Sequence, residues 1–216
     1  MVQYLCMDIC IGIISYLPDA PKVRKARFTR LLSLLAQCDR LFHLPVIIIA
    51  QNYTDAEIKN LGKREIYRYD KLGITGARNA LREKFLASKY DYVIMLDDDV
   101  ALIGNSSVAY LTQIKSNPDC FIEFSKTLLK LFAISKYCFK EVGFAENMNP
   151  EKGEGFEDRL FVNTLRVRFP DRRREFINTG LRQSSISTGD PLSTWYSKQD
   201  LKDMIHKTQE RIEELK

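Results

Sequence analysis

An apolar segment that ends in three consecutive carboxylates constrains the fold of this chain more than any other feature. Residues 92–96 (Tyr-Val-Ile-Met-Leu) are uniformly apolar, which is typical of a strand buried in a sheet. Asp97, Asp98 and Asp99 follow directly, and their charges repel one another unless a cation neutralises them. Open α/β sheets bind ligands at this end of their strands, and Mg²⁺ or Mn²⁺ takes oxygen ligands and bridges phosphates. The segment therefore predicts a metal–phosphate site on a central sheet; the alternative is a solvated acidic turn.

Side chains alternate between the two sides of an extended backbone, so the three aspartates are expected to have different roles. Asp97 and Asp99 are expected on one side of the chain and Asp98 on the other. We expect Asp99 to bind the metal, and Asp97 to bind the metal, a ribose hydroxyl or a metal-bound water. Asp97 and Asp98 are also predicted to contact a nucleotide donor.

Apolar strands and amphipathic helices alternate along the chain, which predicts an α/β fold with a mostly parallel central sheet flanked by helices. The expected strands are residues 9–16, 46–50, 65–69, 92–96 and 128–134. Five helices are expected, each from a signal at its start. These signals are the break at 18–21, the capping box of Thr54 and Glu57, the N-cap residue Thr75, Ser107, and the region near Phe156. Residues 172–174 and 183–194 are predicted to be irregular and mobile.

Length and composition favour a single domain with a C-terminal helix. The chain has 216 residues and a net charge of +5, which permits an anionic partner without requiring one. We expect one domain over residues 1–196. Residues 197–216 are predicted to form an amphipathic helix that packs on the body or on a second subunit. The sequence does not decide the oligomeric state.

The chain carries no sign of a membrane anchor or of export. No apolar run reaches the ~20 residues that span a bilayer, and Asp8 interrupts the apolar N-terminal stretch. The five cysteines form no CxxC pair, which is typical of free thiols in a reducing compartment. We therefore expect a cytoplasmic protein.

Residues 73–79 carry a second group of polar residues suited to phosphate or base binding. A glycine loop opens a predicted helix there, and the free backbone N–H groups of a helix start favour anions. Arg78 and Asn79, in the first turn, could reach a base or a phosphate. A glycine before a helix is more often only a turn, so this segment is weak evidence by itself.

Residues 153–161 carry the third group, in which Glu157 and Asp158 open a helix behind a glycine-rich loop. The helix dipole keeps an acid ionised at this position. An ionised carboxylate near a sugar hydroxyl can act as a general base. The alternative is that both acids only stabilise the first turn.

Taken together, these segments resemble the family-2-type, GT-A-fold glycosyltransferases, which use nucleotide-sugar donors. The resemblance covers about residues 10–168. It rests on the order and spacing of short stretches: Arg78-Asn79, Asp97-Asp98-Asp99, residues 131–136 with 141–144, and Gly155-Phe156-Glu157-Asp158. Each stretch is loose when taken alone.

The resemblance implies a fold, a reaction and a set of site residues. The implied fold is a Rossmann-like sheet. The implied donor is a nucleoside-diphosphate sugar, with a UDP-sugar favoured, and the implied cofactor is Mn²⁺ or Mg²⁺ bound at the acidic segment. Asp158 would be the catalytic base of an inverting transfer to an acceptor hydroxyl. Glu157 would bind an acceptor hydroxyl or orient the loop. The resemblance also implies a nucleotide-sugar-binding half (about 1–100) and an acceptor and catalytic half (about 101–196) of the domain.

Two positions depart from the family pattern. An acid usually follows the second strand to read uracil, but Gln51-Asn52 stands here, so an amide would pair with the base. The usual threonine in the first-strand turn is replaced by Ser15-Tyr16, which we still expect to contact the nucleotide sugar.

The acceptor is the least constrained part of the prediction. Arg172, Arg173 and Arg174 could contact the diphosphate or an anionic acceptor, and Trp195 could stack on a sugar. A solvated basic turn and a packing anchor are the respective alternatives. A glycan precursor, a protein side chain and DNA with a hydroxymethylated base all remain open as acceptors.

Other classes of protein explain the sequence less well. A dehalogenase-type phosphatase places its DxD motif at the first strand, whereas this motif lies in the middle of the chain. A nucleotidyltransferase that acts on sugar phosphates normally has a glycine-rich, basic loop near its first strand, and residues 15–18 (Ser-Tyr-Leu-Pro) are not such a loop. A non-catalytic nucleotide-sugar-binding module is the third alternative.

Overall fold

The computed structural model describes residues 7–104, 107–124, 131–144, 157–176 and 182–185, together with His206, Glu210 and Glu213. A seven-stranded sheet forms its centre, in the order β3-β2-β1-β4-β7-β6-β8. The strands are β1 (Ile9–Tyr16), β2 (Val46–Gln51), β3 (Glu65–Tyr69), β4 (Tyr92–Asp97), β6 (Phe121–Glu123), β7 (Phe132–Ser135) and β8 (Arg173–Glu175). A separate two-stranded ribbon pairs β5 (Val100–Ile103) with β9 (Arg182–Ser185).

Strand direction divides the sheet into two parts. Strands β3, β2, β1 and β4 are parallel, which confirms the mostly parallel α/β prediction. Strand β7 is antiparallel to β4 and to β6, and β8 runs parallel to β6. As a result, β6 runs in the same direction as β1 and β4, and all three end at one edge of the sheet.

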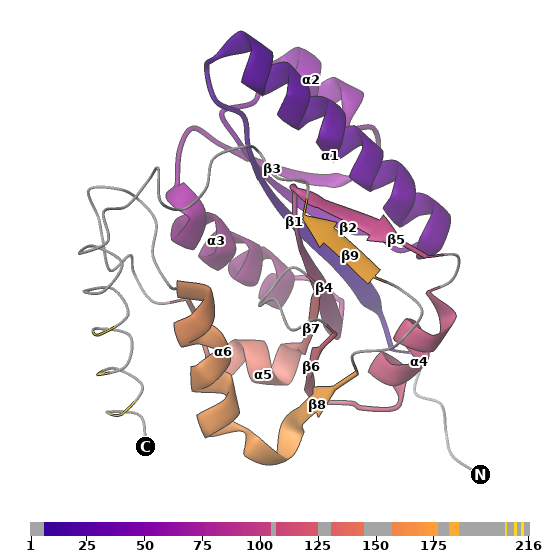
Figure 1. Cartoon of the computed structure of the whole chain (residues 1–216), viewed down its shortest axis with the longest axis vertical. Coiled ribbons are helices and arrows are strands. Elements are labelled where there is room, and N and C mark those ends of the chain that lie inside the picture. The colour runs from indigo at the N-terminus through magenta and orange to yellow at the C-terminus, as the bar shows by residue number, and fades with distance from the viewer. Residues whose placement is uncertain are drawn as a thin grey trace.

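Helices cover both faces of the sheet (Figure 1). One face packs against α1 (Pro21–Leu41), α4 (Val108–Lys115) and β5, with Ile58 of the short helix α2 (Asp55–Asn60) at its border. The other face packs against α3 (Gly73–Ala87), α5 (Lys136–Glu141) and α6 (Glu157–Arg168). A short 3₁₀ turn, Pro170–Arg172, links α6 to β8. Among the described residues, no helix combines the length and apolar character needed to cross a bilayer.

Local signals in the sequence account for most helix positions. Thr54 and Glu57 form the expected capping box of α2, and Pro21 begins α1. The prediction that Thr75 caps its helix was wrong, because α3 begins two residues earlier, at Gly73. Gly12 of β1 allows α3 to approach the sheet closely, since a Cβ at this position would lie 2.8 Å from Leu81.

Four cysteines of the described part, Cys10, Cys38, Cys120 and Cys138, are buried free thiols, as the sequence predicted. Burial raises the pKa of Cys38 to about 12 and that of Cys138 to about 11. These thiols are therefore protonated at neutral pH and poor nucleophiles.

Candidate active site

The carboxyl ends of β1, β2 and β4 bring three predicted segments to one edge of the sheet: Ser15-Tyr16, Gln51-Asn52 and Asp97-Asp98-Asp99. Strand β1 lies between β2 and β4 in the sheet. The connection that follows β1 leads to β2 on one side, and the chain returns later to form β4 on the other side. This is the topological switch point at which open α/β sheets bind ligands. Ile14 pairs with Asp97, and Tyr16 pairs with Gln51, which places the ends of β1, β2 and β4 side by side.

Asp97, Asp98 and Asp99, which we call the acidic turn, connect β4 to β5. Asp97 is the last residue of β4, and Asp98 and Asp99 form a turn before Val100 begins β5. The prediction of a continuous extended backbone was therefore wrong, because the chain reverses here instead of extending the strand. All three residues are half-buried.

Asp98 is bound to the end of the neighbouring strand β1. The hydroxyl of Ser15 donates a hydrogen bond to its Oδ2 at 2.5 Å and lies 2.7 Å from the hydroxyl of Tyr53. Burial raises the pKa of Asp98 to about 6, although the Ser15 hydrogen bond and the charge of Arg27 act in the opposite direction. Ser15 is thus near the acidic turn, as predicted, and Tyr53 joins it from a position 38 residues away that no local pattern reveals.

Arg78 and Asn79 reach different partners from the first turns of α3. Arg78 lies almost fully buried, with its Nη2 3.4 Å from Oδ1 of Asp97. The side chain of Asn79 donates to the carbonyl of Phe144 at 3.0 Å and accepts from the N–H of Phe144 at 2.9 Å. Donor contact by either residue stays a prediction, and these bonds show that Asn79 already fixes a backbone segment.

Arg27 of α1 supplies positive charge on the opposite side of the acidic turn. One of its Nη atoms is 3.5 Å from the carbonyl oxygen of Tyr16, the last residue of β1. Its Nε is buried and has no hydrogen-bond partner within the described ranges. Buried polar groups are normally paired, so an unpaired guanidinium N–H beside a carboxylate turn is a candidate contact for a bound anion. The sequence showed only a basic helix here.

Gln51 and Asn52, the predicted base-reading amides, lie at the end of β2 and have protein partners. Oε1 of Gln51 accepts from the backbone N–H of Leu72 at 2.7 Å. Asn52 adopts a positive φ of 59° and donates to the carbonyl of Leu17 at 2.8 Å. Both residues therefore shape the edge of the site, and their pairing with a base stays a prediction.

Helix α6 begins with Glu157 and Asp158, as the sequence predicted. Oδ1 of Asp158 accepts from the N–H of Arg159 at 2.7 Å. Gly155, Phe156, Trp195 and the side chain of Glu157 lie outside the described residues. The helix itself packs on the sheet through Phe161, Val162 and Leu165.

The prediction that residues 172–174 are irregular was wrong, because Arg173 and Arg174 belong to strand β8. Arg173 donates to Oε1 of Glu123 at 2.8 Å, and Arg174 donates to Oδ1 of Asn117 at 2.9 Å. Arg172 lies over the ring of Tyr137, 4.5 Å from its centroid. These arginines hold protein groups together, and contact with a diphosphate or an acceptor stays a prediction.

The acidic turn has the donor chemistry of a divalent-metal site. In the part of the chain that the structure describes, no three His, Cys, Asp or Glu side chains already converge as a metal cage. Mg²⁺ and Mn²⁺ do not need one when a substrate phosphate supplies the remaining oxygens, since one or two carboxylates then suffice. Asp97 and Asp99 fit that mode, because they are hard oxygen donors at a ligand-binding sheet edge.

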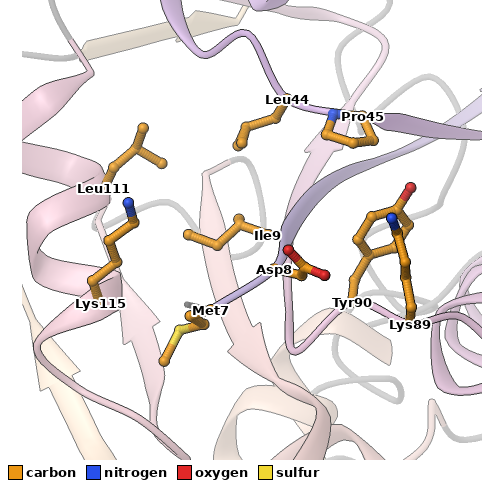
Figure 2. A pocket seen from close by; sticks show the side chains of 9 residues that line it. All are labelled: Met7, Asp8, Ile9, Leu44, Pro45, Lys89, Tyr90, Leu111 and Lys115. Atoms are coloured by element: carbon orange, nitrogen blue, oxygen red, sulfur yellow. The ribbon is translucent and has the colours of Figure 1, made fainter. Parts of the chain in front are cut away.

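The opposite edge of the sheet holds a cavity of about 200 Å³ (Figure 2). Its lining is mainly apolar, with Lys89, Lys115 and Asp8 among the side chains. Because it lies at the amino ends of β1 and β2, it is separate from the acidic turn and contributes nothing to that site.

The sequence matches no protein-family model and no curated protein. Similar folds occur in solved structures of glycosyltransferases. TarS of S. aureus, residues 1–349 in complex with UDP-GlcNAc, is 13% identical with a TM-score of 0.68, over 95% of this chain and 66% of that chain. A mannosyltransferase of Pyrobaculum calidifontis, in complex with GDP-Man and Mn²⁺, is 11% identical with a TM-score of 0.55, over 79% of this chain and 54% of that chain.

A nucleotidyltransferase shares the architecture less closely. A Bacillus anthracis structure described as a putative glucose-1-phosphate thymidylyltransferase is 11% identical with a TM-score of 0.52, over 87% of this chain and 93% of that chain. This chain spans only 38% of a longer TarS structure and 66% of the shorter one. At these identities the likeness concerns the fold alone, and it shows that the chain has a GT-A-type α/β fold.

Proposed function

We propose that this chain is a family-2-type glycosyltransferase that moves a sugar from a nucleoside-diphosphate sugar to an acceptor hydroxyl, with inversion. The observation that carries the proposal is the acidic turn at the switch point between β1 and β4, held by Ser15 and Arg78 on a GT-A fold. The complexes of TarS with UDP-GlcNAc and of the mannosyltransferase with GDP-Man support a nucleotide-sugar donor. We favour a UDP-sugar.

Each residue of the site has its own role in the proposed reaction. Asp97 and Asp99 would hold Mn²⁺ or Mg²⁺, which would supply charge stabilisation to the leaving diphosphate. Arg27, with its unpaired Nε, would bind the same diphosphate. Asp158 would take the proton from the acceptor hydroxyl, whose oxygen then forms the new bond to the anomeric carbon as the bond to the diphosphate breaks.

A panel of donors tests this proposal. Release of nucleoside diphosphate would be measured from UDP-glucose, UDP-GlcNAc and GDP-mannose, with Mn²⁺ and with EDTA. Asp99→Ala is the test variant, and Asp171→Ala, an exposed carboxylate outside the site, is its matched control. We expect one donor to be turned over, only with metal, by the wild type and the control but not by Asp99→Ala. Equal rates in all three proteins would contradict the proposal.

A nucleotidyltransferase acting on sugar phosphates is the second candidate, favoured by the thymidylyltransferase structure that shares the fold over most of both chains. Such an enzyme joins a sugar 1-phosphate to a nucleoside triphosphate and releases pyrophosphate. Pyrophosphate release from dTTP or UTP in the presence of glucose 1-phosphate separates the two candidates, because a glycosyltransferase releases none.

A further inference from the structure

Arg78 connects the acidic turn to an aromatic side chain outside it. The side chain of Arg78 is only 4% exposed, so its charge needs a partner, and Asp97 lies 3.4 Å away. The Cζ of the same guanidinium lies 5.5 Å from the centroid of the Phe144 ring, within the range of a cation–π interaction. One buried arginine therefore touches both a predicted metal ligand and Phe144.

The backbone of Phe144 is fixed by the neighbour of Arg78 in sequence. The amide of Asn79 donates to the carbonyl and accepts from the N–H of Phe144, at 3.0 Å and 2.9 Å. Helix α3 thus holds Phe144 twice, by its ring through Arg78 and by its backbone through Asn79. This arrangement leaves the ring little freedom to move relative to Asp97.

Phe144 in turn holds helix α6. Its ring stacks on the ring of Phe161, with centroids 4.0 Å apart and planes inclined by 17°, and both residues are buried. Phe161 lies three residues after Asp158 in α6, and residues at this spacing share a helix face. The first turn of α6 is therefore tied to Asp97 through three side chains in series.

We propose that Phe144 is a positioning residue that sets the place of Asp158 relative to the acidic turn; this inference rests on the proposed function. An inverting transfer needs the base and the metal-bound diphosphate on opposite sides of the anomeric carbon. Misplacing a catalytic group by about 1 Å can cost ~100-fold in rate. The flat ring of Phe144 contacts both Arg78 and Phe161, and a branched aliphatic side chain cannot contact both in the same way.

The test compares Phe144→Leu with Phe139→Leu, a matched control. Phe139 is also buried in the same core, and its ring lies 5.7 Å from that of Phe161 and 6.2 Å from that of Phe144, but Arg78 lies over the ring of Phe144 and not over that of Phe139. Nucleoside-diphosphate release would be measured with the donor that the panel selects, below the melting temperature of each variant. We expect Phe144→Leu to lower kcat about tenfold or more with KM within about twofold, and Phe139→Leu to keep kcat within about twofold.

A double-mutant cycle with Arg78→Lys tests whether the two residues act as a unit. The kcat losses of Arg78→Lys and Phe144→Leu should be non-additive, since either change breaks the same connection. If Phe144→Leu does not fold, Phe144→Met replaces it in both measurements. Equal kcat losses in the Phe144 and Phe139 variants, with an active wild type, would overturn this inference alone. A wild type inactive toward every donor would overturn the proposed function, and this inference with it.

Discussion

Two groups of carboxylates lie at the same edge of the sheet, and they differ in the positive charge that faces them. In the acidic turn, three carboxylates are close together, and burial raises the pKa of Asp98 to about 6. Two strands away, Glu123 ends β6 with a side chain only 7% exposed, and Arg166 and Arg173 both bind it. Burial acts to raise the pKa of Glu123, but the two arginines outweigh it, and the pKa is lowered.

The difference separates a binding site from a structural ion cluster. Glu123 has two cations for one carboxylate, and Arg166 of α6 and Arg173 of β8 are fixed to β6 through it. Beside the acidic turn, the described residues place two cations, Arg78 and Arg27, against three carboxylates. A divalent cation would complete its charge balance, whereas the Glu123 cluster has no need of one.

The largest expected effect is the loss of activity in Asp99→Asn. This change keeps the shape of the side chain but removes a metal-binding charge, so we expect kcat/KM for donor turnover to fall ~1000-fold. Stability should be unchanged or slightly higher, because one of three mutually repelling charges is removed. Kinetics with Mn²⁺ and thermal melts of the metal-free protein measure the two effects. A marked loss of stability would mean that the turn is itself a structural cluster.

Glu123→Gln should behave in the opposite way, with the second-largest effect. Removing one partner of a buried pair leaves the remaining charges uncompensated, although Arg166 and Arg173 are partly exposed and water offsets part of the cost. We expect the free energy of unfolding to fall by about 2–3 kcal/mol, measured by urea titration. The kcat of the folded fraction should stay within about twofold, and a much larger kcat loss would mean that the link between β6 and α6 through Glu123 also positions the active site.

The contrast between the two groups also marks what the sequence could predict. Strands β1, β2 and β4 were predicted because their apolar runs are long, and Asp97 was predicted because it directly follows the run of β4. Strands β6 and β8 have only three residues each, and β6 is held by partners far away in sequence. Arg173 reaches Glu123 across 50 residues, so a local pattern could only read it as part of a basic turn.

The same limit applies inside the candidate site. Ser15 and Asp98 meet across 83 residues, and no spacing rule indicates which of the three aspartates the serine binds. The turn geometry of Asp98 and Asp99 depends on β5, whose pairing with β9 joins residues about eighty positions apart. The sequence therefore predicted which residues stand at the ends of the strands better than the contacts that these residues make.

A smaller effect is expected from Arg27→Gln, which tests whether this guanidinium binds the diphosphate of the donor. Its Nε has no partner in the described residues, and its hydrogen bond to the carbonyl of Tyr16 is long at 3.5 Å, so we expect only a small loss of stability from that bond and from the charge lost beside Asp98. The KM for the donor should rise about tenfold through the loss of a charge-assisted hydrogen bond. Steady-state kinetics with Lys25→Gln, an exposed cation on the same helix, provide the control. Identical KM values in both variants would remove Arg27 from the donor site.

The smallest effect concerns Glu57, a carboxylate outside both of these sites, which Arg24 binds at 2.5 Å and 2.8 Å. The hydrogen bond from Arg24 lowers the pKa of Glu57 from 4.5 to about 2. A lowered pKa means that the folded state binds fewer protons than the unfolded state, so the stabilisation is complete above pH 4.5 and is lost as the pH falls towards 2. We expect Glu57→Gln to cost about 1 kcal/mol at pH 7, after allowance for solvent screening, and clearly less at pH 3. Urea titrations of both proteins at the two pH values measure the difference. If the loss of free energy of unfolding does not change with pH, shape and packing account for the role of Glu57, and not the paired charge. The same result would weaken the charge argument made for Glu123.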